Sequence, residues 1–325
     1  MSLLLGLPAE LLQLIVESSD SQRDINAFIR TCRYLYNAFD GYLYRYNMQQ
    51  CNRSALFWAA RRGENITVAR SLRAGPYTEV RDIYDETPLI AAVSGRQQSI
   101  VKQLLMTIHH GLDLEATGQH GRTALAHAAW DGQIQMASLL LAKGASLASK
   151  DTDDASPLIL AAVNGHHEVM TLLLDHGAAL EAQDRLGQTA LAWAAEYGKV
   201  QTVELLLERG AVVDSRDRQQ STPLLLAARN GHDVVVKRLL EKGADANARD
   251  LNGWTAIHHA AWHSPKKVVI EHLLEAGADP KATIRHGKTG ADLADAAILC
   301  VAEKSVVHRM LLQAAGESNS IGVAC

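Results

Sequence analysis

The sequence predicts an all-α fold, a solenoid of stacked helix pairs preceded by a small helical module at the N-terminus. The first observation is a short signature: serine or threonine, then proline or alanine, then leucine or isoleucine. It begins at residues 54, 87, 123, 156, 189, 222 and 255, so it recurs every 33 residues except for one step of 36. A fixed period of this length marks a repeat architecture, in which each unit buries its apolar face against its neighbours. The second observation is a glycine that closes the leucine-rich stretch of several units, at Gly144, Gly177, Gly210 and Gly243.

Each part of a unit has a predicted structural role, which is clearest in residues 184–211. Thr189 lies where the N-cap or first turn of a short inner helix belongs, and the small Ala194 and Ala195 let neighbouring helices approach closely. Gly198 can end this helix in a left-handed conformation, and Gly210 closes the outer helix that follows. This unit resembles the ankyrin repeat consensus almost residue for residue. The resemblance implies hairpin-like fingers between the helix pairs and a protein-binding concave face.

Two parts of the array depart from the period. The 36-residue step adds three residues, about Thr107 to His109, which we expect to lengthen the outer helix of the second unit. After residue 255 the signature decays to Thr289-Gly290-Ala291-Asp292, and the helix through Leu311 carries polar residues, which predicts a terminal cap. We therefore expect an F-box-like helical module at 1–48, an array of about seven repeats at 49–290, and a degenerate capping repeat with a tail at 291–325.

The first 48 residues lie outside the period and carry a different pattern. Proline at the first position of a helix is favourable, and Leu11, Leu12 and Ile15 form an apolar stripe at helical spacing. The segment Leu7-Pro8-Ala9-Glu10-Leu11-Leu12, followed by Thr31-Cys32-Arg33-Tyr34-Leu35-Tyr36, resembles an F-box in the form common in fungal proteins. This resemblance implies docking on a Skp-family linker protein of a cullin-RING ubiquitin ligase. The linker-facing positions that it implies are Leu7, Pro8, Leu11, Ile15 and Ile25.

The same apolar stripe has an alternative interpretation. The N-terminal helices could simply cover the first repeat, because the end of a repeat array needs an amphipathic cap. Both interpretations require the stripe, and only the first requires that another protein can reach it.

The phase of the array indicates which side chains face a target, because ankyrin repeats build their concave face from finger tips and from the two residues before the inner-helix glycine. The helix positions are Arg61, Arg62, Trp130, Asp131, Val163, Asn164, Glu196, Tyr197, Arg229, Asn230, Trp262 and His263. The finger positions are Tyr84, His120, Arg122, Arg185, Leu186, Arg218, Leu251, Trp254 and Arg285. Tryptophan, tyrosine and arginine dominate protein-binding hot spots. The predicted target-binding residues are Tyr84, Arg122, Trp130, Arg185, Tyr197, Arg229, Trp254 and Trp262.

Tryptophans in this array can also be structural. The concave tryptophans could instead pack against a neighbouring finger. Trp58 and Trp193 lie four residues after the start of the signature, and we expect this phase to face the interior of the stack.

The fourth signature residue is histidine in the ankyrin consensus, where it bonds between adjacent units. Here it is present only as His258, and apolar side chains replace it elsewhere. This departure puts the usual hydrogen-bond ladder in doubt and predicts a greater reliance on packing.

Composition and charge argue against several classes of function. The chain has 32 lysines and arginines against 36 aspartates and glutamates, so it lacks the positive field that gathers nucleic acid or an anionic membrane. Its four cysteines are far apart, which predicts free thiols in a reducing compartment, the cytosol or nucleus. His259 and His263 have a spacing that could ligate a metal on a helix, but no third ligand is evident, so a packed or surface pair is favoured. We expect no cofactor, no metal and no membrane segment.

These observations favour a binding protein without catalytic activity. The first hypothesis is a substrate-recognition subunit of a Skp/cullin/F-box ubiquitin ligase, which holds its target on the concave ankyrin face. The second is an ankyrin scaffold without a link to a ligase. An enzyme with a histidine-lined pocket is a remote third.

Overall fold

The structure is a computed structural model that describes residues 54–74, 81–82, 85–106, 112–296 and 301–316. The chain divides into two compact units, Met1–Gln119 and His120–Cys325. The predicted linker-binding positions, between Leu7 and Ile25, lie outside the described residues, as does Tyr84. The boundary expected at residue 48 also lies outside them and stays a prediction.

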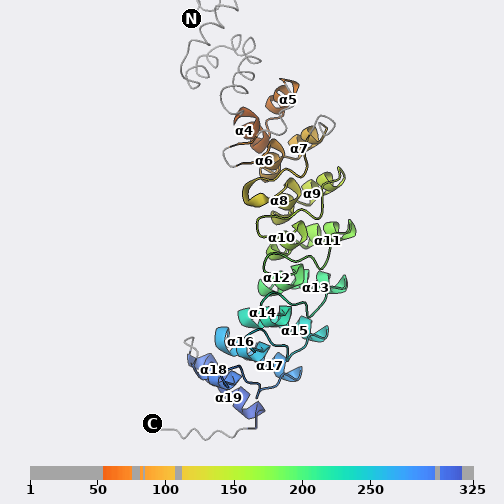
Figure 1. The fold of residues 1–325 in the computed structure, drawn as a ribbon. Coiled ribbons are helices and arrows are strands. Elements are labelled where there is room, and N and C mark those ends of the chain that lie inside the picture. The colour runs from red at the N-terminus through yellow and green to blue at the C-terminus, as the bar shows by residue number, and fades with distance from the viewer. Residues whose placement is uncertain (1–53, 75–80, 83–84, 107–111, 297–300, 317–325) are drawn as a thin grey trace, which may run out of the picture. The chain divides into compact units, whose positions relative to one another are not determined.

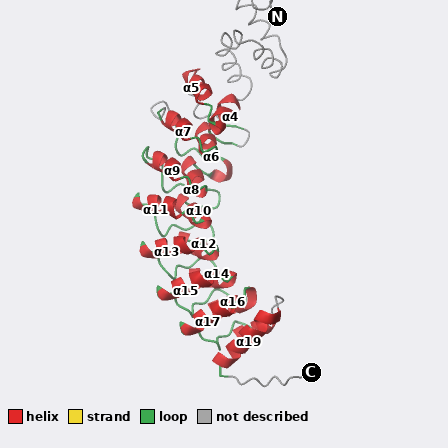
Figure 2. Cartoon of the chain, turned by 180° about the vertical axis from the view of Figure 1, so that it is seen from behind, coloured by secondary structure: helices red, strands yellow, loops and turns green. Residues whose placement is uncertain are grey.

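Short inner helices alternate along the chain with outer helices (Figures 1 and 2). The inner helices are α4 (Ser54–Arg62), α6 (Pro88–Ser94), α8 (Ala124–Trp130), α10 (Pro157–Asn164), α12 (Ala190–Glu196), α14 (Pro223–Asn230), α16 (Ala256–His263) and α18 (Gly290–Ala296). The outer helices are α5 (Asn65–Ala74), α7 (Gln98–Leu105), α9 (Ile134–Leu141), α11 (His167–Asp175), α13 (Val200–Glu208), α15 (Asp233–Glu241), α17 (Lys267–Glu275) and α19 (Val301–Ala314). A 3₁₀ turn, η3 (Gln119–Gly121), precedes α8.

The described residues form no β-strand, only an isolated antiparallel bridge between Thr283 and Thr289. The all-α prediction is therefore confirmed.

The start and end of the inner helix follow the predicted local chemistry. Thr189 is the N-cap of α12, and its hydroxyl accepts a hydrogen bond from the N–H of Ala192. Gly198 and Gly210 have φ values of 65° and 86°, a left-handed conformation that glycine adopts without a steric penalty. The predicted roles of these three residues are confirmed.

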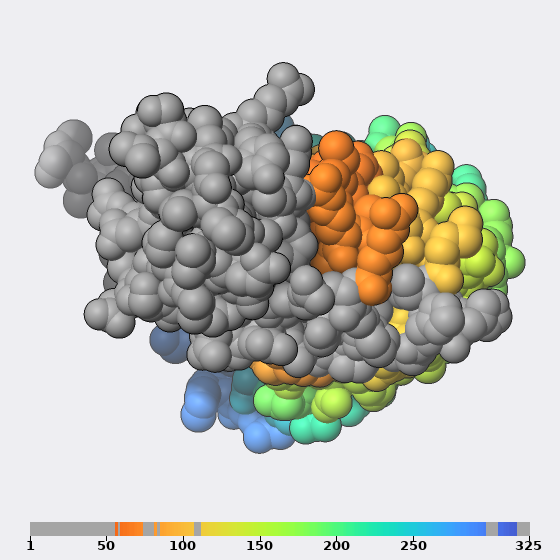
Figure 3. All heavy atoms as spheres, turned by 90° about the horizontal axis from the view of Figure 1, so that it is seen from above, coloured from red at the N-terminus to blue at the C-terminus, as the bar shows by residue number. Residues whose placement is uncertain are grey.

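The core of each unit lies between the two layers of helices. In the second unit each inner helix packs on the next inner helix and each outer helix on the next outer helix (Figure 1). Ala194 and Ala195 are fully buried at the inner contacts, and Leu206 is fully buried on the outer helix. In the first unit α4 packs on α6 and α5 on α7, so the orange atoms of Figure 3 lie against the yellow-orange ones.

The predicted lengthening of the second outer helix is wrong. Helix α7 has eight residues, whereas α11 and α13 have nine, and Met106 is its C-cap. The buried face of α7 ends at Leu104 and Leu105, and the Met106 side chain is already 72% exposed. Helix α7 therefore ends before the inserted residues, which lie outside the described part of the chain.

His258 bonds between adjacent units, as the consensus predicts. Its Nε2–H donates to the carbonyl of Ala282 in the next finger (3.0 Å). Its Nδ1 accepts from the N–H of Thr255 (3.1 Å), which fixes the tautomer of the ring.

Polar bonds also join units that lack the consensus histidine, so the doubt about a hydrogen-bond ladder does not hold for them. His166 and His232 each donate from Nε2 to a carbonyl of the preceding repeat, at 3.0 and 2.9 Å. Between fingers, Nη1 of Arg216 donates to the carbonyl of Arg249 (3.0 Å), and Nη1 of Arg249 donates to that of Thr283 (2.8 Å). These units are thus linked by hydrogen bonds at other positions than the consensus histidine.

The last helix pair has one buried face and one polar face. Helix α18 packs on α16, and α19 packs on α17 and α18. Within α19, Val307 and Leu311 are fully buried, whereas Arg309 is exposed. Such a one-sided pair is what the end of a repeat array requires.

Candidate functional site

The fingers of the second unit are fixed by aspartates that lie five residues before each signature. Oδ1 of Asp184 accepts hydrogen bonds from the backbone N–H groups of Leu186 (2.8 Å) and Gln188 (2.9 Å). Asp217 and Asp250 make the same pair of bonds in the next two fingers. Asparagine and aspartate stabilise turns in this way, and here the bonds leave the tip residues, such as Leu186, exposed.

Four rings from the last regular repeat form an aromatic and imidazole cluster. The indoles of Trp254, on the finger, and Trp262, on α16, meet edge to face with centroids 6.5 Å apart and planes at 89°. His259 and His263 stack on each other at 5.9 Å, and their centroids lie 5.1 and 6.0 Å from that of Trp254. The two tryptophans are half-buried and His263 is exposed, so the cluster presents ring surface to solvent.

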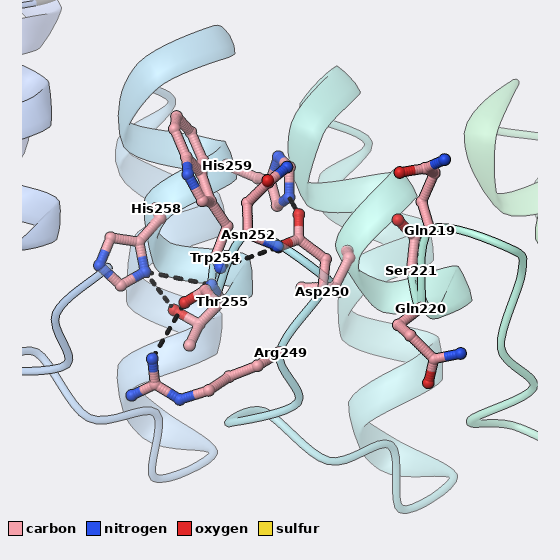
Figure 4. Close-up of polar contacts among 12 residues, drawn as sticks. Gln219, Gln220, Ser221, Arg249, Asp250, Asn252, Trp254, Thr255, His258 and His259 are labelled. Carbon is pink, nitrogen blue, oxygen red and sulfur yellow. Dashed lines mark hydrogen bonds and ion pairs between the residues drawn. The ribbon is translucent and has the colours of Figure 1, made fainter. Parts of the chain in front are cut away.

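An aspartate beneath this cluster positions one of its rings. Oδ2 of Asp250 accepts a hydrogen bond from Nε2 of His259 at 3.0 Å (Figure 4). Burial raises the pKa of Asp250, but the bonds from His259, Trp254 and Asn252 outweigh it and hold the pKa below its usual value. Asp250 is therefore a carboxylate at neutral pH.

The Asp250–His259 pair is structural rather than catalytic, as the repeat two units earlier indicates. At the equivalent place, Oδ2 of Asp184 accepts a hydrogen bond from Nε1 of Trp193 at 2.7 Å. An indole cannot transfer a proton at neutral pH, so the shared role of the two aspartates is to hold a ring on the inner helix.

His263 is neutral at pH 7. Partial burial and the positive charge of Arg229, on the preceding inner helix, lower its pKa from 6.5. The exposed edge of the cluster therefore carries no charge of its own at neutral pH.

Trp193 and Tyr197 form a second aromatic surface on α12. Their rings stack with centroids 5.7 Å apart and planes at 8°, and the Tyr197 side chain is 50% exposed. The expectation that Trp193 lies in the core is wrong, because its ring is only half-buried and turns toward Asp184 of its own finger. Leu160 and Leu226 are buried at the same phase, so the position accommodates an aliphatic side chain but leaves an indole partly exposed.

Trp130 marks the start of this face in the second unit. The guanidinium carbon of Arg122 lies 4.1 Å from the centre of the Trp130 ring, within cation–π range, and its Nε lies 3.4 Å from Oδ2 of Asp151. Arg185 is exposed, donates to the carbonyl of Thr152 and lies 3.9 Å from a carboxylate oxygen of Asp153.

The structure brings together some of the predicted residues but not all of them. It pairs Trp254 with Trp262 and Arg122 with Trp130, and it places Arg229 beside the last cluster. Arg185 and Tyr197 lie on a third repeat, and within the described residues neither contacts these groups. Trp193 and His259 join the face although the phase argument did not select them. The sequence does carry a signal for both residues. An aspartate lies five residues before a signature at 151, 184, 217 and 250, and two of these aspartates hold the rings of Trp193 and His259.

The described residues contain no cluster of three or more histidines, cysteines, aspartates or glutamates that could hold a metal ion. None of the described helices is long and apolar enough to cross a membrane.

The fold and this face define a repeat protein that presents a protein-interaction surface. A family model described as ankyrin repeats matches residues 56–151, 146–217 and 213–284. These matches cover more than half of the sequence, and the chain belongs to the ankyrin repeat family. A solved structure that it resembles is the crystal structure of the human ASB11 ankyrin repeat domain, with 29% identity and a TM-score of 0.60, covering 68% of this chain and 96% of that one. No curated protein matches the sequence.

Proposed function

We propose that this chain is an adaptor that recruits a target protein to a ubiquitin ligase. In this proposal the concave ankyrin face holds the target, and the F-box-like segment at residues 1–48 holds a Skp-family linker protein. The chain catalyses no reaction itself, and it acts in the cytosol or nucleus.

The observation that carries target binding is the row of partly exposed rings along one side of the inner helices. Trp130, Trp193, Trp254 and Trp262 are half-buried, and Tyr197 is exposed. Aromatic rings bury a large area on contact and are enriched at binding hot spots, so a folded chain that leaves five of them accessible favours a partner.

The ligase connection rests on the N-terminal motif. Leu7, Pro8 and Leu11 match the front of an F-box, and the segment lies outside the repeat period, so the ankyrin consensus does not account for it. The motif supports a separate docking function for residues 1–48, although a cap on the first repeat would use the same apolar stripe.

Proximity labelling with the full chain fused to a labelling enzyme tests both parts. Leu11→Asp combined with Ile15→Asp should abolish labelling of Skp and cullin proteins and leave target labelling intact. Trp130→Ala combined with Trp262→Ala should do the reverse, with target labelling reduced about fivefold or more. Val234→Ala with Val268→Ala, two exposed side chains on outer helices, is the matched control and should change neither set.

The second candidate, an ankyrin scaffold without a ligase link, predicts a different result. In that case no Skp or cullin protein is labelled by the wild-type chain, or their labelling survives the Leu11→Asp and Ile15→Asp changes. Either result, with unaltered circular dichroism, would overturn the ligase part and leave target binding standing.

A further inference from the structure

Three arginines on the inner side of the last repeats have no counter-ion among the residues that the structure describes. Arg218 lies on the finger before α14, Arg229 near the end of α14, and Arg285 on the finger before α18, and all three are exposed. Among the described residues none of these guanidinium groups takes part in an ion pair. A charge that folding leaves unpaired on a binding face is available to a partner.

On the outer side of the same repeats, three cationic side chains do form ion pairs. Arg209 pairs with Asp175 at 2.9 Å, and Arg238 pairs with Glu204 at 2.8 Å. Lys267 pairs with Glu271 at 3.1 Å. The chain has a net charge of −4, yet among the described residues none of its acidic groups forms an ion pair with Arg218, Arg229 or Arg285.

The acidic groups of the inner fingers are turned inward. The carboxylates of Asp217 and Asp250 are held by backbone N–H groups of their own turns. Burial raises the pKa of Asp217, and the bonds from Ser221 and Gln219 oppose it. The carboxylates of Asp217 and Asp250 are thus occupied by their own turns and do not pair with the three arginines.

The unpaired arginines flank the tryptophan cluster from both neighbouring repeats. Arg229 is close enough to His263 to lower the pKa of that ring, which itself lies 6.0 Å from Trp254. On the other side, a Cβ placed on Gly253, next to Trp254, would lie 3.7 Å from Cγ of Arg285. Cationic groups and exposed ring surface therefore alternate across this part of the concave face.

We propose that this arginine–tryptophan face, made of Arg218, Arg229, Trp254, Trp262 and Arg285, binds an acidic segment of the target protein. Aspartate or glutamate side chains pair with the three guanidinium groups, and an apolar side chain of the segment packs on the two indoles. The inference rests on the proposed protein-binding function and specifies the chemistry of the partner.

The dimensions of the face set the length of the segment. Packed helices lie about 10 Å apart, so a peptide that reaches from the Arg218 finger to the Arg285 finger spans two such steps, about 20 Å. An extended chain rises about 3.3 Å per residue, so about six residues cross the face.

A peptide titration tests the inference with the full chain. The probe is a fluorescein-labelled synthetic peptide of about ten residues in which glutamate alternates with leucine, and lysine replaces glutamate in its counterpart. Polarisation should rise with the glutamate peptide and not with the lysine peptide, and binding should weaken as salt is added.

Two triple variants with the same change in net charge separate the face from the bulk charge. Arg218→Gln, Arg229→Gln and Arg285→Gln together should weaken binding of the glutamate peptide about tenfold or more. Arg209→Gln, Arg238→Gln and Lys267→Gln, on the outer helices, should change it less than about twofold. Because all six side chains lie at the surface, circular dichroism should report the same fold for both.

Three outcomes would overturn the inference: equal weakening by both triple variants, equal binding of the lysine peptide, or tighter binding of a single-stranded DNA of similar length. Repeating the proximity labelling with the inner triple variant distinguishes this failure from failure of the proposed function. If target labelling depends on Trp130 and Trp262 but not on the three arginines, the concave face binds protein and only the acidic chemistry is wrong. If it depends on none of these residues, target binding on this face is wrong as well.

Discussion

The buried ring of His258 couples the stability of the array to pH. It is fully buried, donates from Nε2 to the carbonyl of Ala282 and accepts at Nδ1 from the N–H of Thr255, so the folded state holds it neutral. Burial is the main cause that lowers its pKa from 6.5. Below pH 6.5 the imidazole is therefore protonated in the unfolded chain but stays neutral in the folded one. The free energy of unfolding decreases as the pH is lowered through this range.

The variant His258→Leu isolates this effect. Leucine is tolerated at this place, since Leu225 occupies it in the preceding repeat and is buried. At pH 7.5 we expect the variant to be less stable by about 1 kcal/mol, because the hydrogen bonds of the ring are lost. As the pH falls below 6.5, wild type should lose this advantage by up to about 1.4 kcal/mol per pH unit.

Urea unfolding followed by circular dichroism at pH 7.5 and 5.5 provides the measurement. The other titrating groups are common to both proteins, so only the difference between their unfolding free energies is interpreted. A difference that stays constant between the two pH values would show that the ring is protonated in the folded state.

At the residue scale, the sequence was sufficient to predict the position of a side chain where that position depends on local or periodic features. It predicted that Trp254, on a finger, and Trp262, on an inner helix, share one face, and their rings meet edge to face. It failed for Trp193, whose exposure depends on the size of the ring and on a bond to Asp184 in the finger. It also could not show that Arg229 and Arg285 have no counter-ion in the described part of the chain, since ion pairing depends on contacts between repeats.

At the scale of single elements, two glycines with similar backbone conformations have different surroundings. Gly198 ends an inner helix and Gly210 follows an outer helix, with φ of 65° and 86°. A Cβ on Gly198 would lie 2.5 Å from Nδ1 of His232, whereas the described residues place no atom within 4 Å of a Cβ on Gly210. Gly198 is thus needed both for its left-handed backbone conformation and for the close approach of His232. Gly210 is needed only for its backbone conformation.

Alanine substitutions should separate these two contributions. Gly210→Ala should cost about 1 kcal/mol, the strain of a left-handed residue. Gly198→Ala should cost about 3 kcal/mol, because His232 must also move and lose its 2.9 Å bond to the carbonyl of Glu196. Urea midpoints of the two variants give the comparison.

A double variant serves as the control. In a His232→Ala background the obstruction is absent, so the added cost of Gly198→Ala should fall to that of Gly210→Ala. If the cost of Gly198→Ala stays the same without His232, the ring is not its cause.

At the scale of the whole molecule, the period predicted most of the array and its helix starts, because each N-cap is a local bond, as at Thr189. It did not predict where α7 ends, since that depends on where burial ends, at Leu105. Nor did it predict the hydrogen bonds between fingers, because Arg216 and Arg249, which donate them, do not occupy consensus positions that were used for the prediction.

Stacking of this kind makes stability a sum of neighbouring contacts, so damage at one end should stay there. Leu311 on α19 is fully buried, and a Cβ on Gly290 of α18 would lie 3.4 Å from its Cδ1 and 2.5 Å from Cγ2 of Ile257 on α16. Leu311→Asp should therefore detach α18 and α19 and expose the apolar face of α16 and α17, whereas Val306→Asp, at a side chain 39% exposed on the same helix, should have little effect. Hydrogen exchange should show protection lost from α16 to α19 in the Leu311 variant and kept in α10 and α12. Equal loss of protection from α8 to α19 would mean instead that these repeats unfold as one cooperative body.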